Sequence, residues 1–470
     1  MKTLLCFVLA VGLATAHAEE IALINGTMIN PATNQILPGA TIHIDGDRIV
    51  SVVVRPDKLD NTKGARIIDC KGKFILPGYI DTHVHFFQSG DIYTRPDAVD
   101  LTGVRPYKDE VAWIKRNLPD ALGRYIRCGI TSVVDVGGPF WNFEARRIAN
   151  STAKAPRVAV AGPLISSVAR PQLDLGDPPI VKIDTPEQGR EMVRKLAAKN
   201  PDYVKIWYIV NAENPVEKFR PVVHAVIEEG HARKLRVAVH ATELEAARTA
   251  VEEGADLLVH SVTDKLVDEP FVRLLKEKGT ILCPTLVVFE RYGRTFAGKL
   301  NLTPEEKAWG NPEVIASLDV TKIPPDKMPD RIKSMLANPD AVLDRIQKTY
   351  DVALKNLKTL EDAGVIIAAG TDAGNIGTIH GPALFREFQL MKEAGLTPMQ
   401  IFQCATINAA KTFGGEIGPK IGALAPGDFA DLVILKSNPV DDIAHASDIE
   451  SVMKNGVLYS GKTLENDSSR

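Results

Sequence analysis

Several features are scarce or missing in this 470-residue sequence. The 56 lysine and arginine residues nearly balance the 59 aspartate and glutamate residues, so the formal charge is only −3. Proteins whose main partner is a nucleic acid usually carry a basic excess, and this chain has none. No short-period repeat is present, which excludes coiled coils and collagens. Hydrophobic residues make up 45% and charged residues 24%, a globular composition that excludes wholesale disorder.

Cysteine is also scarce, with five residues and no CxxC pair. Cys6 lies in the N-terminal apolar run, and Cys70, Cys128, Cys283 and Cys404 are spread over the chain. An oxidising compartment would permit a disulfide, but the spacing identifies none. Small buried thiols are therefore the favoured interpretation.

The N-terminus is the one place with an export pattern. Lys2 precedes an apolar run from Leu4 to Ala14, and Ala16-His17-Ala18 fits the small-residue cleavage pattern of a signal peptide. A membrane anchor is the alternative, but about 20 apolar residues are needed to span a bilayer, and neither this run nor a later one reaches that length. We expect residues 1–18 to be removed and the protein to be secreted or periplasmic, with no membrane contact after cleavage.

Both ends of the remaining chain predict short strands joined by turns. Near the start, Ile42-His43-Ile44 and Ile49-Val50-Ser51-Val52 flank Asp45-Gly46-Asp47, which is a hairpin pattern. Near the end, Ala430 to Leu435 is followed by a second hairpin over 451–459. Because chain termini often lie close together, we expect 19–73 and 420–470 to form one composite β-sandwich domain.

Between these ends, predicted strands alternate with predicted helices. The segment 243–253 is one such helix, since Leu244, Ala247 and Val251 share a face at helical spacing. This alternation favours an α/β fold, a parallel (β/α)8 TIM barrel over 74–419, with its active site at the carboxyl ends of the strands. A doubly wound open sheet is the alternative, but no GxGxxG follows an early strand. A helical lid or rim is expected over 289–343. The eight predicted strands are 74–85, 131–136, 157–161, 203–210, 236–241, 257–262, 280–288 and 365–371.

Several predicted strands end in side chains that commonly bind metals. The first ends with His83 and His85, which face the same side because residues two apart on a strand do so. The fifth and sixth end with His240 and His260, and the eighth with Asp372. Taken singly, such a histidine is more often a polar core residue, and such an aspartate a helix N-cap. Because four of only ten histidines meet at one rim, the set indicates a metal site.

Lys205 lies in the middle of the apolar fourth strand, between Val204 and Ile206. A lysine there is costly unless it is paired or modified, and loss of water favours its neutral amine. A neutral amine can take up CO2 and become a carbamate, an anionic oxygen ligand able to bridge two metal ions. The alternative, which the strand alone favours, is a lysine that reaches the strand end and pairs with a carboxylate.

Taken together, these motifs resemble the amidohydrolase superfamily over nearly the whole chain after residue 18. They are the HxH pair after the Pro77-Gly78-Tyr79-Ile80-Asp81 strand, the lysine, the two later histidines, the Gly370–Gly374 segment and Ala430-Asp431-Leu432-Val433. His380-Gly381, Leu396-Thr397-Pro398 and Cys404–Ala410 are similar to the branch of Xaa-Pro dipeptidases (prolidases) and imidazolonepropionase-like enzymes. The lysine implies the binuclear subtype, because mononuclear deaminases and imidazolonepropionase-type members do not use it.

The resemblance implies that six side chains hold two divalent ions. These are His83, His85 and Asp372 on the first ion, His240 and His260 on the second, and carboxylated Lys205 between them. Zinc suits imidazole and carboxylate ligands, and manganese or cobalt would also fit. A metal-bridging hydroxide would attack the scissile carbonyl, and Asp372 would carry its proton to the leaving amine.

The expected substrate is a small molecule, either a dipeptide of the Xaa-Pro kind or an N-acyl amino acid, cleaved at its amide bond. In the related dipeptidases, loop residues hold the free carboxylate of the substrate, and the candidates here are Tyr208, Arg170 and His380. A hydrolase of cyclic amides, lactones or other esters with the same centre is the alternative. A non-catalytic binding protein on this scaffold is least favoured. Arg386 and Glu387 are expected to form a pair on a helix surface, and a homo-oligomer is left open.

Overall fold

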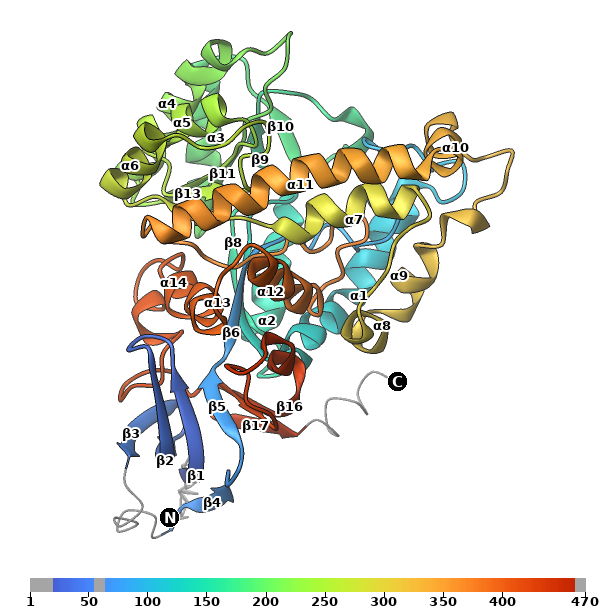
Figure 1. Ribbon diagram of the computed structural model, residues 1–470. Helices are drawn as coiled ribbons and strands as arrows, with labels where there is room; N and C mark the ends of the chain where they lie inside the picture. The colour runs from blue at the N-terminus through green and yellow to red at the C-terminus, as the bar shows by residue number, and fades with distance from the viewer. Residues whose placement is uncertain (1–19, 55–63, 461–470) are drawn as a thin grey trace, which may run out of the picture.

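The computed structural model describes residues 20–54 and 64–460, so the predicted signal peptide, residues 1–18, lies outside the described residues. Figure 1 shows a strand-and-helix barrel above a β-sheet domain that contains strands from both chain ends. The predicted α/β fold, a TIM barrel with a small β-sandwich domain made from both ends, is therefore confirmed.

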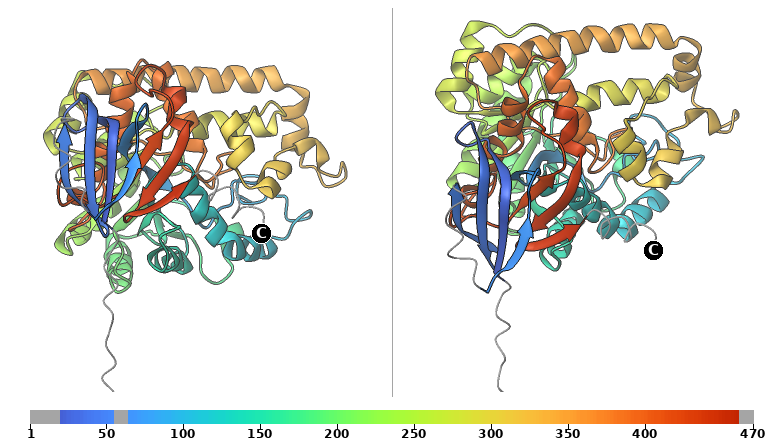
Figure 2. Two further views of the ribbon diagram at one scale, coloured as in Figure 1. Left: turned by 90° about the horizontal axis from the view of Figure 1, so that it is seen from below. Right: turned by 60° about the horizontal axis from the view of Figure 1, so that its bottom comes forward.

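One sheet of eight strands forms the β-sandwich domain, and in Figure 2 its N-terminal (blue) and C-terminal (red) strands lie side by side. The strands run in the order β17-β16-β15-β5-β1-β2-β3, with β4 paired to β1. Leu23 of β1 lies opposite Ile42 of β2, and both pack in a core with Ile75 and Leu432. The strands are β1 (Glu20–Asn30), β2 (Gln35–Asp45), β3 (Arg48–Val54), β4 (Arg66–Asp69), β5 (Phe74–Pro77), β15 (Leu432–Leu435), β16 (Ile449–Lys454) and β17 (Val457–Ser460).

The sequence predicts one barrel strand over 74–85, but the structure divides it at Gly78. β5 pairs with β1 and β15, whereas β6 (Tyr79–Val84) pairs with β7 (Ile130–Asp135) of the barrel. Gly78 is required at this junction because a Cβ here would overlap the side chain of Thr131. β5 belongs to the sheet of the β-sandwich domain, so the expected domain boundary between residues 73 and 74 lies one strand too early.

Seven paired strands and one extended segment make the barrel wall. The expected eighth strand, 365–371, forms a single isolated bridge, between Ile367 and Leu282 of β14. It still closes the barrel, because Ala368 N donates to the Leu282 carbonyl and Thr82 N donates to the Ala369 carbonyl. The remaining barrel strands are β8 (Arg157–Val160), β11 (Tyr203–Trp207), β12 (Arg236–His240), β13 (Leu257–Val259) and β14 (Ile281–Cys283), and β9 (Leu164–Ser166) and β10 (Ile180–Lys182) extend the sheet beside β11.

Amphipathic helices cover the barrel. In α5 (Leu244–Glu252) the predicted face, Leu244, Ala247 and Val251, is buried. The other covering helices are α1 (Tyr107–Arg127), α2 (Phe143–Asn150), α3 (Pro186–Ala197), α4 (Val216–Ala232), α6 (Glu269–Lys278), α11 (Pro339–Asp362), α12 (Ala383–Glu393), α13 (Pro398–Ala405) and α14 (Ile407–Ala410).

The predicted rim over 289–343 is helical and packs on the loop that follows β6. Ile92 and Leu101 of that loop share a core cluster with Phe296 and Ile332. A buried ion pair of 2.6 Å between Arg291 and Glu306 joins the first two rim helices. These helices are α7 (Leu286–Phe296), α8 (Pro304–Trp309), α9 (Pro312–Ser317) and α10 (Asp330–Ala337).

Two expectations about this region are wrong. The predicted strand 280–288 ends at Cys283, because α7 begins at Leu286. Glu387 is not on a helix surface, since it is fully buried and accepts hydrogen bonds from the backbone N–H groups of Leu286 and Val287. The first N–H groups of a helix have no partner within the helix, and this carboxylate supplies one.

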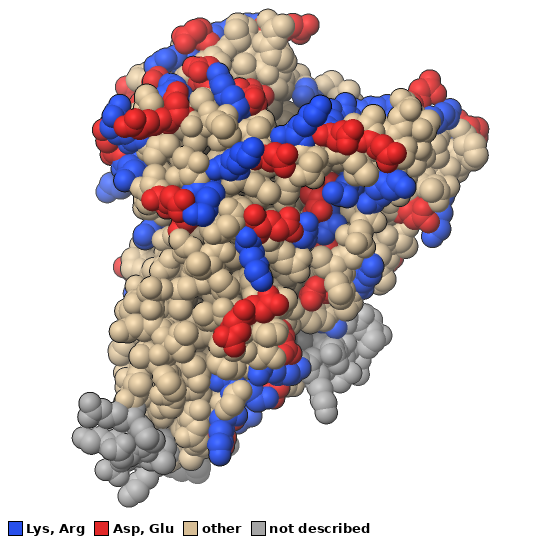
Figure 3. Space-filling view, viewed as in Figure 1, with Lys and Arg blue, Asp and Glu red and all other residues tan. Residues whose placement is uncertain are grey.

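The mixture of surface charges and the burial of the cysteines agree with the composition of the sequence. In Figure 3, lysine and arginine intermingle with aspartate and glutamate over α7 and α11. Within the described ranges, no helix is both long enough and apolar enough to cross a membrane. Cys70, Cys128, Cys283 and Cys404 are buried free thiols, as expected.

Candidate metal centre

A cavity of about 290 Å³ lies at the carboxyl ends of the barrel strands. The six side chains that the sequence predicts as metal ligands all line it. They are His83, His85, Lys205, His240, His260 and Asp372. The barrel thus brings together residues from five separate parts of the chain.

Three of these side chains converge on one point. His83 Nε2 and His85 Nε2 lie 3.2 Å apart, and Asp372 Oδ1 lies 3.4 Å and 3.2 Å from them. His85 Nδ1 is 2.7 Å from the Gly137 carbonyl, which can only accept, so this nitrogen carries the proton and Nε2 carries the lone pair. Two imidazole nitrogens and a carboxylate oxygen that face one another form a His-His-Asp metal site.

The protonation states of the histidines fit a cation. Burial lowers the pKa of His83, His240 and His260 well below the usual value, so these imidazoles are neutral and can offer lone pairs. Asp372 Oδ1 and Lys205 Nζ are buried and have no hydrogen-bond partner within the described ranges. Buried polar atoms rarely lack partners, so this donor set fits a divalent metal ion.

The other half of the cavity contains His240, His260 and Lys205. The ring centres of His83 and His260 are 4.9 Å apart, and those of His260 and His240 are 4.5 Å apart, so the imidazoles form a continuous row. Lys205 is only 1% exposed, and burial lowers its pKa to about 7. A second group of nitrogen-bearing side chains therefore lies directly beside the His-His-Asp cluster.

Asp372 has a left-handed backbone, with φ of 62°, which is strained for a residue with a side chain. Its N–H donates to the His83 carbonyl at 2.7 Å. The buried carboxylate of Asp81 accepts hydrogen bonds from the N–H and hydroxyl of Thr371, at 3.0 and 2.7 Å. These bonds hold the strained segment against β6, beside the two histidines.

His260 is held in a similar way, with φ of 76°. Its N–H donates to the Cys283 carbonyl, and its Nδ1 shares a 2.6 Å hydrogen bond with Thr285 Oγ1. Thr285 immediately precedes α7, whose first N–H groups are bound by the buried Glu387. A chain of contacts from α12 thus sets the orientation of the His260 ring.

The three predicted substrate contacts do not line this cavity, so their placement corrects the sequence-based expectation. Tyr208 follows the end of β11, and its hydroxyl donates to the Val216 carbonyl at 2.6 Å. Arg170 lies over the Trp207 ring, 5.0 Å from its centre, and its Nε is 3.3 Å from Asp97. Side-chain alternation turns Tyr208 away from Lys205.

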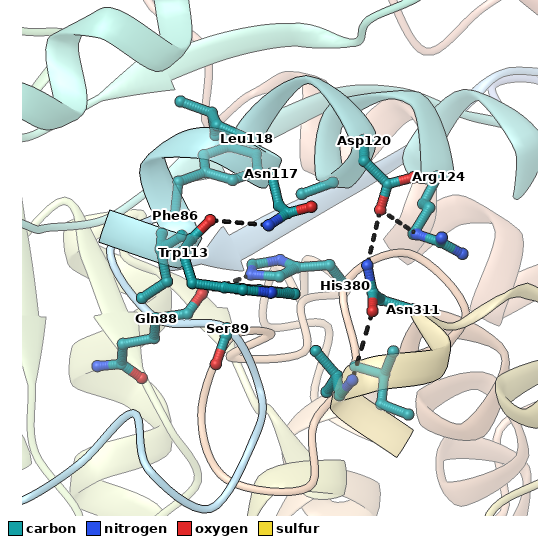
Figure 4. A pocket seen from close by; sticks show the side chains of 14 residues that line it. Phe86, Gln88, Ser89, Trp113, Asn117, Leu118, Asp120, Arg124, Asn311 and His380 are labelled. Carbon is teal, nitrogen blue, oxygen red and sulfur yellow. Dashed lines mark hydrogen bonds and ion pairs between the residues drawn. The ribbon is translucent and has the colours of Figure 1, made fainter. Parts of the chain in front are cut away.

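His380 lies in a separate small pocket, shown in Figure 4. Its Nε2 donates to the Gln88 carbonyl at 2.8 Å, and its Nδ1 accepts from the Tyr125 hydroxyl at 2.8 Å. Both ring nitrogens are thus occupied, and the ring stacks on Phe86. His380 supports the chain just after the HxH pair and does not face the metal cavity.

Sequence reasoning missed several residues that do line the cavity. They are Arg95, Trp207, Phe289, Tyr292 and Asn375. Trp207 could have been found, because it lies two residues after Lys205 and shares its face of β11. Arg95 lies in the loop after the first barrel strand, where active-site residues are expected, but nothing local distinguishes it from other loop arginines.

Similarity to known proteins agrees with this geometry. Residues 74–459 match the sequence profile of the Amidohydrolase family. Ochratoxinase from Aspergillus niger is 24% identical over 485 aligned residues, which cover 96% of this chain and 88% of that protein. Its crystal structure has a TM-score of 0.71 at 22% identity and covers 95% of this chain and 96% of that one. The crystal structure of an Xaa-Pro dipeptidase with bound methionine in the active site has a TM-score of 0.69 at 23% identity, covering 94% of this chain and 100% of that one. At these identities the structures share the fold.

Replacing Thr285 tests how the His260 ring is held. Thr285→Val keeps the side-chain shape but removes the partner of His260 Nδ1. Loss of such a supporting group typically weakens metal binding by about 10- to 100-fold, and we expect a loss of that size when the protein is titrated with zinc. Competition with a chelating dye measures it.

Thr280→Val is the matched control, because Thr280 is also buried and donates to the Ala255 carbonyl at 2.8 Å, away from the metal ligands. This variant should bind zinc as the wild type does. Equal zinc affinities in the wild type and Thr285→Val would show that Thr285 has no part in holding the ligand.

Proposed function

The chain belongs to the Amidohydrolase family and is a metal-dependent hydrolase acting on C–N bonds; from this premise we propose that it cleaves the amide bond of small dipeptides or N-acyl amino acids at a centre of two divalent ions. The observation that carries the proposal is the placement of Lys205. Its buried amine has no hydrogen-bond partner within the described ranges and lines the same cavity as the His-His-Asp cluster, His240 and His260.

Carboxylation of Lys205 would complete the ligand set. The neutral amine attacks the carbon of CO2, a C–N bond forms, and one proton leaves to solvent. The resulting carbamate has one negative charge and two oxygen atoms, which allows it to reach both halves of the cavity. Imidazole, carboxylate and carbamate together suit zinc, and manganese or cobalt would also be accepted.

Divalent ions held by these side chains would lower the pKa of a bound water and polarise the scissile carbonyl. Asp372 is placed to handle the proton. Its Oδ2 accepts a hydrogen bond of 3.1 Å from Asn375 Nδ2, which fixes the plane of the carboxylate, while Oδ1 faces His83 and His85. Asp372 takes the proton from the attacking water and passes it to the nitrogen of the leaving amine.

The size of the cavity supports a small substrate. At about 290 Å³ it lies at the lower end of the range for small-molecule sites. Trp207, Phe289 and Tyr292 contribute aromatic wall to it. The structural similarity to an Xaa-Pro dipeptidase supports dipeptides as one class of substrate.

A substrate panel on zinc-reconstituted protein tests the proposed reaction. It contains dipeptides, with Xaa-Pro among them, N-acyl amino acids, cyclic amides and lactones. We expect free amino acid to be released from the first two classes, because the site can protonate a leaving amine. Asp372→Asn should retain some metal and be nearly inactive, which ties the hydrolysis to this centre.

Two results would contradict the proposal. Activity confined to lactones or ring amides would favour the alternative substrates. Fewer than about one metal per chain, with no activity restored by zinc and bicarbonate, would favour a non-catalytic binding protein.

Carboxylation predicts that zinc restores activity to metal-free protein only when dissolved CO2 is present. Since burial lowers the pKa of Lys205 to about 7, the neutral fraction of the amine rises from about one tenth at pH 6 to about nine tenths at pH 8. At a fixed concentration of dissolved CO2, the initial rate of reactivation should therefore be about tenfold higher at pH 8.

Lys205→Ala should not reactivate at either pH and should lose more than about 100-fold in kcat/KM, beyond the usual cost of removing a supporting group. Lys454→Met is the matched control, since Lys454 is also buried but lies on β16, where it bonds to Asn455. Wild-type turnover and two bound metals in Lys205→Ala would rule out the bridging role.

We also propose that the protein is exported to the periplasm or the medium, on the strength of the pattern in residues 1–18. Protein recovered from outside the cytoplasm should begin at Glu19, because the small-residue pattern ends at Ala18. N-terminal sequencing measures this. A cytoplasmic product that still begins at Met1 would contradict it.

A further inference from the structure

Among the described residues that line the metal cavity, the arginine, lysine, aspartate and glutamate side chains are Arg95, Lys205 and Asp372. The proposed function assigns Lys205 and Asp372 to the metal centre. Arg95 is left as the charged side chain that can meet a substrate. Its side chain is 13% exposed.

The surroundings of Arg95 fix its orientation and leave a positive charge. Its Nε and Nη2 each donate to one oxygen of Asp97 at 2.7 Å, as a two-pronged pair. The Asp97 side chain is 1% exposed and also lies 3.3 Å from Arg170 Nε. Two guanidinium groups share one carboxylate, so the group of three has a net charge of +1.

The remaining nitrogen of Arg95 is the one with the weakest contact. Nη1 lies 3.4 Å from Asn375 Oδ1, which is long for a hydrogen bond. Asn375 in turn donates to Asp372 Oδ2 at 3.1 Å. One amide side chain therefore separates Arg95 from the carboxylate at the metal site, so an anion bound at Nη1 would lie close to the reacting bond.

Aromatic residues share the cavity with this cation. Trp207, at the end of β11, and Phe289 and Tyr292, on α7, line it together with Leu164 and Ile180. A cavity with one fixed cation and apolar walls suits a ligand that has one anionic group and a bulky apolar group.

We propose that Arg95 binds an anionic group of the substrate, such as the α-carboxylate of an N-acyl amino acid, while the aromatic wall receives an apolar side chain. This inference rests on the proposed function and narrows its substrate class to amides with a free carboxylate and a large apolar substituent. Arg95 thus has the role of binding the substrate carboxylate, for which the sequence analysis gave Tyr208, Arg170 and His380 as candidates.

The first test compares N-acetyl-L-phenylalanine with its carboxamide, which has the same shape but no negative charge. A charge-assisted hydrogen bond is typically worth about 10- to 100-fold, so the wild type should favour the acid by that factor in kcat/KM. Arg95→Gln should lose the preference, chiefly by raising KM for the acid, and should leave the carboxamide within about twofold. Arg95→Lys keeps the positive charge but cannot donate two parallel hydrogen bonds, so it should retain part of the preference for the acid.

Arg105→Gln is the matched control. Arg105 lies on the same loop but binds Asp91 and Glu110, outside the cavity. It should keep the wild-type ratio of acid to carboxamide. Zinc content and melting temperature, measured for every variant, separate loss of recognition from loss of folding.

A second test does not depend on turnover. Calorimetric titration of the zinc-loaded protein with 3-phenylpropionate and 3-phenylpropionamide should show tighter binding of the anion, and Arg95→Gln should abolish the difference. If the anion preference depends on Arg95 but no amide in the panel is hydrolysed, the proposed function fails and the anion site stands. If Arg95→Gln keeps the preference, or loses the same factor for acid and carboxamide, Arg95 only holds its loop to Asp97 and the inference is overturned.

Discussion

The hydrogen bonds that join β6 to the segment after residue 365 are the contact on which the metal centre depends. They close the barrel, and they bring Asp372 to His83 although the two are far apart in the sequence. The buried Asp81 carboxylate adds side-chain bonds to Thr371 at the same point. A left-handed residue such as Asp372 costs about 1–3 kcal/mol, so this density of bonds is what keeps the carboxylate facing the imidazoles.

In that arrangement, buried polar atoms such as Asp372 Oδ1 and Lys205 Nζ have no hydrogen-bond partner among the described residues. Two imidazole nitrogens and a carboxylate oxygen face one another, and a desolvated amine lines the same space. Buried polar atoms of this kind are costly unless a partner satisfies them. Divalent cations would bind the nitrogen and carboxylate ligands. The carbamate proposed on Lys205 would add a negative charge that partly offsets the positive charge of these cations. The geometry of the ligands, the lowered pKa of Lys205 and metal binding are therefore energetically linked.

The sequence was most informative where function is encoded by short spacing. The HxH pair, the lysine within an apolar strand and the histidines after the fifth and sixth strands are local patterns, and the structure brings them to one cavity. The sequence was less informative where tertiary packing decides. Residues 365–371 form a single isolated bridge, and β5 joins the other domain at Gly78. Glu387 is buried where it binds the first N–H groups of α7. No spacing rule reveals that a charged helix residue will meet the N-terminus of another helix.

Substrate contacts were the hardest to predict, for a related physical reason. The candidate metal ligands lie at strand ends, whose positions are fixed by the hydrogen bonds between neighbouring barrel strands. Specificity depends on loops, which vary in length and path between proteins of one fold. Arg95 reaches the cavity only because its own loop holds Asp97 in place and because the rim helices pack on that loop through Ile92 and Leu101. The rim helices therefore support the proposed anion site indirectly, through the loop on which they pack.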